Sequence, residues 1–178
     1  AASVATSNRT VPGSPKSESQ SKRLWVAVEH DDATEARAAL DYGAGTEWGN
    51  PSFQQNTCLH RAVELGREAI IRVLVQEGCA NVDARNHFGD TPLHKAAKAC
   101  DAEMVALLLS LGASAAIKNY NEKTPADLAA SGRYREGQED IIKALNKAAR
   151  PKSARTRRSR PGSRATSRRA SADAGIAG

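Results

Sequence analysis

Aromatic residues are scarce in this chain of 178 residues: Trp, Tyr and Phe together make up 4% of it, although 40% is hydrophobic. A core built from such a sequence must be mainly aliphatic and rich in alanine, which suits short helices packed closely together. Long apolar runs are missing as well. No segment reaches the roughly 18 to 20 apolar residues that cross a bilayer, and the first residues lack a secretory apolar stretch. We therefore expect no membrane span and no export.

Cysteine is also rare, and its pattern is not that of a disulfide scaffold. The chain has Cys58, Cys79 and Cys100, an odd number with no CxxC pair, which favours reduced thiols in a reducing compartment. A zinc site needs about four converging ligands. Cys58 and His60 stand two residues apart at a predicted helix start, which points them to different sides. We expect no metal site and a cytoplasmic protein.

Motifs of catalysis are missing. The sequence has no phosphate-binding loop, no glycine-rich dinucleotide motif, no HExxH and no G-x-S-x-G. Acidic neighbours such as Asp31–Asp32 and Glu139–Asp140 point apart on a helix, which favours a solvated face over general acid–base work. We expect a protein without enzymatic activity and without a cofactor.

What the chain does have is a recurring phrase. At residues 91–97 it reads Thr-Pro-Leu-His-Lys-Ala-Ala. Thr91 suits a helix cap, Pro92 suits the first helical position, and Leu93 begins an apolar stripe that the alanines continue. Related phrases begin 34 residues upstream at Thr57 and 33 residues downstream at Thr124, with a fainter copy at residues 24–28. A unit of this kind buries its apolar face only against a neighbour, so the period predicts a stacked array.

A second phrase repeats in phase with the first. Glycine follows the apolar helical segment of each unit, at Gly43, Gly78 and Gly112. Glycine in this place accepts a positive φ and ends a helix. Each unit is therefore expected to hold two helices.

With these two phrases the chain resembles an ankyrin-repeat protein over about residues 22–147, and most closely from Gly89 to Lys123. The resemblance implies an all-α solenoid of stacked helix pairs with hairpin loops, flanked by disordered tails. About four repeats are expected, at residues 22–55, 56–89, 90–122 and 123–147. In this family the histidine of the phrase bridges backbone groups of neighbouring units, so His60 and His94 are expected to be structural.

Several departures from the family pattern give further expectations. Ala80 reads as a one-residue insertion before a hairpin. Glu122 stands where the hairpin glycine belongs, so we expect Asn121 to take the left-handed conformation instead. Asp127 replaces the histidine of the phrase in the last unit, as outer units of a stack drift from the consensus. The apolar interior is expected to join Leu59, Leu93 and Leu128.

The two ends differ in composition from the repeats. Residues 1–21 are rich in Ser, Thr and Pro, and residues 148–178 form a basic Arg/Ser-rich tail; both are expected to be disordered. Residues 150–178 hold nine basic residues and one acid, a formal charge of +8 in a chain of net charge +6.

The charge of the tail predicts a salt-sensitive attraction to an acidic partner, such as nucleic acid, anionic lipid or the acidic surface of tubulin. The expected polyanion-binding residues are Arg155, Arg157, Arg158, Arg160, Arg164, Arg168 and Arg169. Ser159 and Ser171 each follow a pair of arginines closely and are candidate phosphorylation sites, where phosphate would offset the positive charge.

The resemblance also implies where a protein partner docks, on the concave side formed by hairpin tips and by the exposed face of each first helix. Phe53, Phe88 and Tyr120 fall at predicted hairpin tips, where they either form a contact ladder for a partner or fold back on their hairpins. The expected contact residues are Phe53, Gln54, Asn56, Glu64, Leu65, His87, Phe88, Asp90, Lys98, Ala99, Tyr120, Asn121 and Lys123.

These features favour a non-enzymatic adaptor or scaffold that binds a protein partner on its concave face and an acidic partner through its tail. Two alternatives stay open: a structural subunit of a microtubule-based, axonemal or ciliary, assembly, and a nuclear or nucleic-acid-associated regulator. A cytoskeletal or ciliary location follows from the first alternative and a nuclear one from the second. The fold does not choose among them.

Overall fold

The computed structural model describes residues 15–132 and 137–150, which form helices joined by turns and loops. Within these residues there is no strand longer than an isolated bridge between Asn50 and Asn56. The elements are α1 Pro15–His30, α2 Ala33–Asp41, the 3-10 turn η1 Pro51–Phe53, α3 Cys58–Glu64, α4 Glu68–Gln76, α5 Pro92–Ala99, α6 Ala102–Ser110, α7 Pro125–Ser131 and α8 Gln138–Ala149. None of the described helices has the length and apolarity needed to cross a lipid bilayer.

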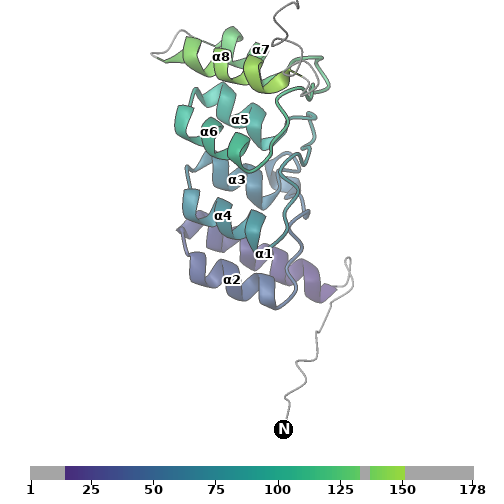
Figure 1. Cartoon of the computed structure of the whole chain (residues 1–178). Helices are drawn as coiled ribbons and strands as arrows, with labels where there is room; N and C mark the ends of the chain where they lie inside the picture. Colours follow the sequence, from purple (N-terminus) through teal and green to yellow (C-terminus); the bar gives the residue numbers. More distant parts are fainter. Residues whose placement is uncertain (1–14, 133–136, 151–178) are drawn as a thin grey trace, which may run out of the picture.

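The helices form antiparallel pairs that stack along one axis, from α1 and α2 to α7 and α8 (Figure 1). The first helices of the pairs, α1, α3, α5 and α7, contact one another in that order. The loops that join one pair to the next lie together along one edge of the stack (Figure 1). The all-α solenoid expected from the sequence is confirmed.

The first helices of the last three pairs, α3, α5 and α7, start where the repeated phrase predicts. Thr57, Thr91 and Thr124 directly precede α3, α5 and α7, in extended backbone conformation. Each is part of a capping box in which the third residue of the helix accepts a hydrogen bond from the threonine amide. In α7 this third residue is Asp127, which accepts from the Thr124 amide at 2.9 Å. The replacement of histidine by Asp127 therefore keeps the cap.

A column of alanines lets the first helices approach closely. Five residues after each cap position stand Ala62, Ala96 and Ala129, all 0–1% exposed. Leu59 and Leu93 are buried beside them in one continuous apolar cluster. The expectation for Leu128 was wrong: it is half-buried and lies outside that cluster. Counted from its cap, Ala126 holds the place of Leu93, and it is Ala126 that is buried.

The first helix begins earlier than the predicted boundary at residue 22. Helix α1 starts at Pro15, and Ser21, which was assigned to the disordered segment, is buried. The hydroxyl of Ser21 accepts a hydrogen bond from the Gly45 amide at 2.9 Å. This contact ties the part of α1 that contains Ser21 to the loop after α2. Predictions made for residues 1–14 and 151–178 lie outside the described residues.

The turn after α4 corrects a second expectation. Ala80 is not inserted, because it takes the buried place that Ala113 takes in the next unit. The amide of Ala80 bonds to the carbonyl of Leu74, six residues back, whereas that of Ala113 bonds to Leu108, five residues back. The extra residue thus lies before Ala80, and Cys79 adopts the positive φ expected of Gly78.

The tip of the last hairpin corrects a third expectation. Glu122 itself adopts a positive φ of 58°, and Asn121 does not. The backbone geometry of the turn is therefore kept without a glycine, at the steric cost that a side chain meets in this region. The amide of Glu122 bonds to the carbonyl of Asn119 at 3.0 Å, which closes the turn.

Candidate protein-binding surface

The hairpin tips are tied to one another by backbone hydrogen bonds. The amide of His87 donates to the carbonyl of Gln54 at 2.9 Å, and the amide of Tyr120 donates to the carbonyl of Phe88 at 3.1 Å. These bonds join three successive loops that are about 33 residues apart in the sequence. The row of tips is therefore held as one rigid edge.

Buried asparagines hold each hairpin from inside. The side-chain oxygen of Asn86 accepts from the amides of Phe88 and Asp90, at 2.9 and 3.0 Å, and its amide group donates to Asn56 at 2.9 Å. Asn119 repeats the pattern one unit later and donates to Asp90 at 2.7 Å. Asn56 was expected at the contact surface. It is only 3% exposed, so it supports the tips and does not offer its side chain to a partner.

The three aromatic residues predicted at the tips are exposed. Phe53 is 39% exposed, Phe88 43% and Tyr120 67%. Phe53 also packs on Trp25, with ring centroids 5.3 Å apart, and Tyr120 lies against Gly89, where an added Cβ would come within 2.9 Å of the Tyr120 ring. These aromatic side chains therefore lean on their neighbours and still present a face to solvent. The contact ladder for a partner stays a prediction.

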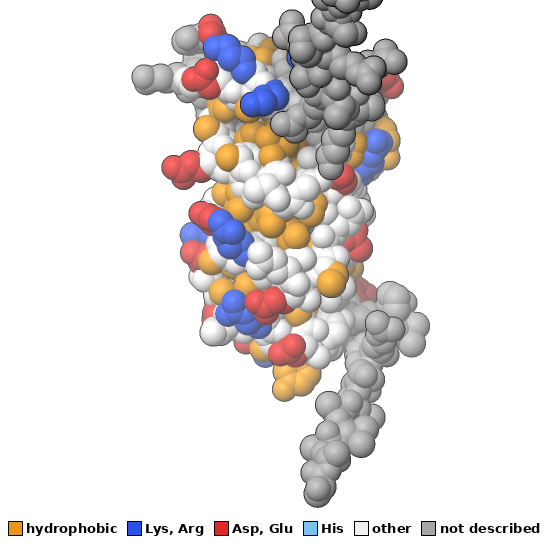
Figure 2. Space-filling model, viewed as in Figure 1, with side chains coloured by type: hydrophobic (Ala, Val, Ile, Leu, Met, Phe, Trp, Pro, Cys, Tyr) orange, Lys and Arg blue, Asp and Glu red, His pale blue; other side chains and the backbone are white. Residues whose placement is uncertain are grey.

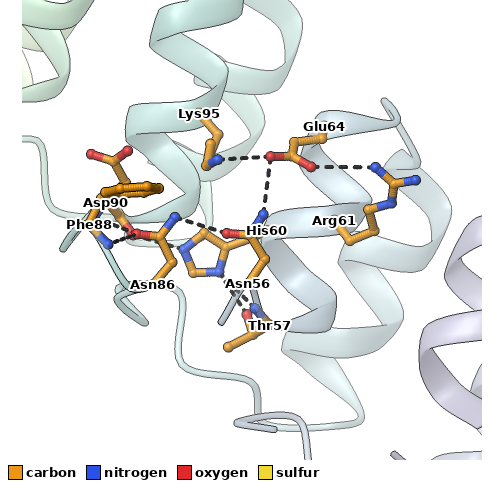
Figure 3. Close-up of polar contacts among 9 residues, drawn as sticks. All are labelled: Asn56, Thr57, His60, Arg61, Glu64, Asn86, Phe88, Asp90 and Lys95. Atoms are coloured by element: carbon orange, nitrogen blue, oxygen red, sulfur yellow. Dashed lines mark hydrogen bonds and ion pairs between the residues drawn. The ribbon is translucent and has the colours of Figure 1, made fainter. Parts of the chain in front are cut away.

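Next to the tips, the exposed sides of α3 and α5 carry a line of ion pairs (Figure 3). Arg61 contacts Glu29 at 3.3 Å and Glu64 at 3.6 Å. Glu64 also contacts Lys95 at 3.0 Å, and the Asn56 side chain donates to it at 3.3 Å. We call the tips together with the exposed sides of α1, α3, α5 and α7 the inner face.

The opposite face, over α2, α4 and α6, carries charges of both signs between apolar side chains (Figure 2). A groove of about 590 Å³ lies there, lined by Glu68, Arg72, Glu103 and Leu107 among others. Arg72 is paired with Glu68 at 2.6 Å. With mixed and partly paired charges, this groove favours no one class of ligand.

Comparison with known proteins agrees with the geometry. A family model for ankyrin repeats, present in many copies, matches residues 59–109. The mouse ankyrin repeat domain-containing protein 37 is 30% identical over 106 residues, which are 60% of this chain and 64% of that protein. The yeast ankyrin repeat-containing protein YGL242C is 33% identical over 81 residues, 41% of this chain and 45% of that protein. This chain is an ankyrin-repeat protein.

Other relatives carry the repeats within much longer chains. The zebrafish palmitoyltransferase ZDHHC17 is 36% identical over 70 residues, which are 39% of this chain but 11% of that protein. The chain spans less than two thirds of the length of each of these relatives. What the similarity carries over is the ankyrin array, which is a module for protein–protein interaction.

The two histidines of the phrase link neighbouring ankyrin repeats, as expected. The Nε2 atom of His60 lies 2.9 Å from the carbonyl oxygen of Asp90, and that of His94 lies 3.0 Å from the carbonyl oxygen of Lys123. In each ring Nδ1 accepts from the amide of the capping threonine, so Nε2 carries the proton and donates. Both rings are fully buried.

Burial also sets the chemistry of the array. It lowers the pKa of His60 to about 4, with the nearby Lys95 charge acting in the same direction and the bond to the Asp90 carbonyl against it. Burial likewise raises the pKa of the Cys58 thiol to about 12. These groups are held in their neutral forms at pH 7. Among the described residues no group of His, Cys, Asp and Glu side chains is arranged to hold a metal ion.

The predicted contact residues differ in how far their side chains are exposed on the inner face. Leu65 and Asp90 are half-buried, while Gln54, His87, Lys98, Asn121 and Lys123 are exposed. Sequence reasoning missed Glu29, Arg61 and Lys95. The sequence does contain a signal for Arg61 and Lys95, since both stand four residues after a cap threonine. Charged residues repeated at one register position mark a shared face.

Proposed function

We propose that this ankyrin array acts by binding a protein partner on its inner face, as an adaptor or scaffold. The observation that carries the proposal is the exposure of Phe53, Phe88 and Tyr120 on tips that backbone hydrogen bonds tie together. Exposed aromatic side chains held in fixed positions lose little conformational entropy on binding and are favoured anchors in interfaces.

The test is a double substitution, Phe88→Ala with Tyr120→Ala. Phe53 is left unchanged because its packing on Trp25 contributes to folding. A partner would first be isolated by affinity purification with the whole chain and identified, and its affinity for the variant would then be measured with purified proteins. We expect a loss of at least tenfold in affinity, because anchor residues each contribute more than about 1 kcal/mol.

Tyr42→Ala is the matched control, because Tyr42 is as exposed as Tyr120 and caps the C-terminal end of α2, so it is not a hairpin-tip residue. Unchanged affinity in the double variant would contradict the proposal. So would a melting temperature far below that of the control, since the aromatic side chains would then serve the fold.

The basic tail supports a second, separable activity, the docking of an acidic partner. Its support is the formal charge of +8 over residues 150–178. Co-sedimentation with microtubules, with and without residues 151–178, tests a structural role in a microtubule-based assembly. Salt titration of binding to duplex DNA tests a nuclear role, and no binding at moderate salt would remove that alternative.

A further inference from the structure

The inner face has a regular charge pattern that comes from the repeat register. Two positions of each unit, four and seven residues after the cap, lie about one helical turn apart on the exposed side of the first helix. The position at four residues holds Val26, Arg61, Lys95 and Leu128 in the successive units. The position at seven residues holds Glu29, Glu64, Lys98 and Ser131.

Through the first three units these positions form ion pairs, both within α3 and between neighbouring first helices. Glu29 contacts Arg61. Arg61 in turn contacts Glu64, and Glu64 contacts Lys95 (Figure 3). Acid and base alternate along the line, and the side chain of Lys95, the last member, is only 15% exposed. We call this line the charge ladder.

The charge ladder stops at α5. The pattern of Glu29 and Glu64 calls for an acid at the next equivalent position, and Lys98 stands there instead. Lys98 is exposed, and its side chain has no ion pair or hydrogen bond among the described residues. Lys123, whose carbonyl is fixed by His94, also has no ion pair among the residues that the structure describes.

This region also has apolar side chains that are only half-buried or are exposed. Leu128 stands where Arg61 and Lys95 stand in the preceding units, and it is half-buried outside the apolar cluster. Tyr120 and Phe88 lie on the hairpin tips of the same two units. The stretch from α5 to α7 thus combines two unpaired cations with exposed apolar groups.

We propose that this stretch binds an acidic segment of a partner protein, with a carboxylate on Lys98 and a neighbouring apolar side chain on Leu128. The partner would supply the acid that is missing from the charge ladder. The inference rests on the proposed function, since it names the chemistry of a partner on the inner face. A nucleic acid fits less well, because the Glu64 carboxylate lies on the same face, 3.0 Å from Lys95, and repels a chain of phosphates.

The test uses the whole chain with its leucine methyl groups labelled with ¹³C. The probe is a peptide of 12 residues in which Glu and Leu alternate, and a peptide of alternating Lys and Leu is its charge-inverted control. A site-resolved signal is needed because the basic tail also attracts acids. We expect the Glu/Leu peptide to shift the Leu128 methyl signals and the Lys/Leu peptide not to.

Charge reversal at Lys98 then tests whether a carboxylate of the partner extends the charge ladder. Lys98→Glu should weaken the binding seen at Leu128 about fivefold or more, since one attraction becomes a repulsion. Lys147→Glu is the matched control, because Lys147 is exposed on α8 with no ion pair among the described residues, and it should change the affinity less than about twofold.

Three results would overturn the inference: no shift at Leu128, equal effects of the two charge reversals, or a duplex DNA that shifts Leu128 as strongly as the peptide. The proposed function would survive these results if the Phe88 and Tyr120 variant still lost its partner. It would fail separately if that double variant bound its partner normally.

Discussion

Acidification from pH 7 to pH 5 should destabilise the array by about 2 kcal/mol through His60 alone. The ring is fully buried, and its Nδ1 already accepts the Thr57 amide. Burial disfavours the charged imidazolium, because protonation would place a charge in the interior. The pKa of His60 is therefore lowered from 6.5 to about 4 in the folded state.

The sign of this pH effect follows from the number of protons that the folded and the unfolded chain bind. Between pH 6.5 and pH 4 the unfolded chain holds a proton on His60 that the folded chain does not, so the free energy of unfolding falls as the pH falls. The contribution is present above pH 6.5 and is lost progressively toward pH 4. Lowered pKa values of Asp32 and Asp127, which come from hydrogen bonds to Thr34 and Thr124, act below their usual value of 3.8 and so lie outside this window.

The assay is urea unfolding followed by circular dichroism at pH 7 and at pH 5, on the unchanged chain and on His60→Gln. The variant should be less stable at pH 7, and it should lose about 2 kcal/mol less on acidification. His94, whose pKa burial also lowers, accounts for part of the remaining slope. An equal slope in both proteins would refute the reasoning.

Four further substitutions test the packing, each read as the free energy of unfolding in urea at pH 7. Gly89→Ala should cost about 2 kcal/mol, because Gly89 has a φ of 74° and a Cβ there would lie 2.9 Å from the Tyr120 amide nitrogen; a neutral effect would contradict the tip geometry. Leu93→Ala should cost about 2 to 5 kcal/mol and Leu128→Ala less than about 1, and a reversed order would mean that the core register is wrong. Asn86→Ala should cost about 2 to 4 kcal/mol, since two backbone amides lose their acceptor, and a loss below about 1 would show that water replaces it.

Much of the fold could be predicted because the repeat phrase acts locally. Thr91 and Pro92 favour a helix start whatever surrounds them, and the spacing to Thr57 and Thr124 indicates the stack. The roles of His60 and His94 followed from the family pattern. The exposure of the hairpin tips could be predicted as well, because a hairpin between stacked units leaves its end in solvent.

The wrong predictions about the turns have a common physical cause. The sequence does not show which residue takes the unusual backbone conformation where a turn departs from the repeat pattern. Glu122 itself takes the left-handed conformation, because the Asn119 side chain fixes the turn. Its oxygen accepts hydrogen bonds from the amides of Asn121 and Lys123, on either side of Glu122. Cys79 takes the same conformation because the extra residue after α4 shifts the turn by one position. The charge ladder was missed for another reason, since pairing between Glu64 and Lys95 depends on which side of the stack each helix shows.

The most direct test of the central claim is amide hydrogen exchange of the array with and without its purified partner. If the inner face binds the partner, protection should concentrate at residues 85–99 and 118–131, which hold the second and third tips, Lys98 and Leu128. Protection confined to α4 and α6, around the groove on the opposite face, would contradict the account.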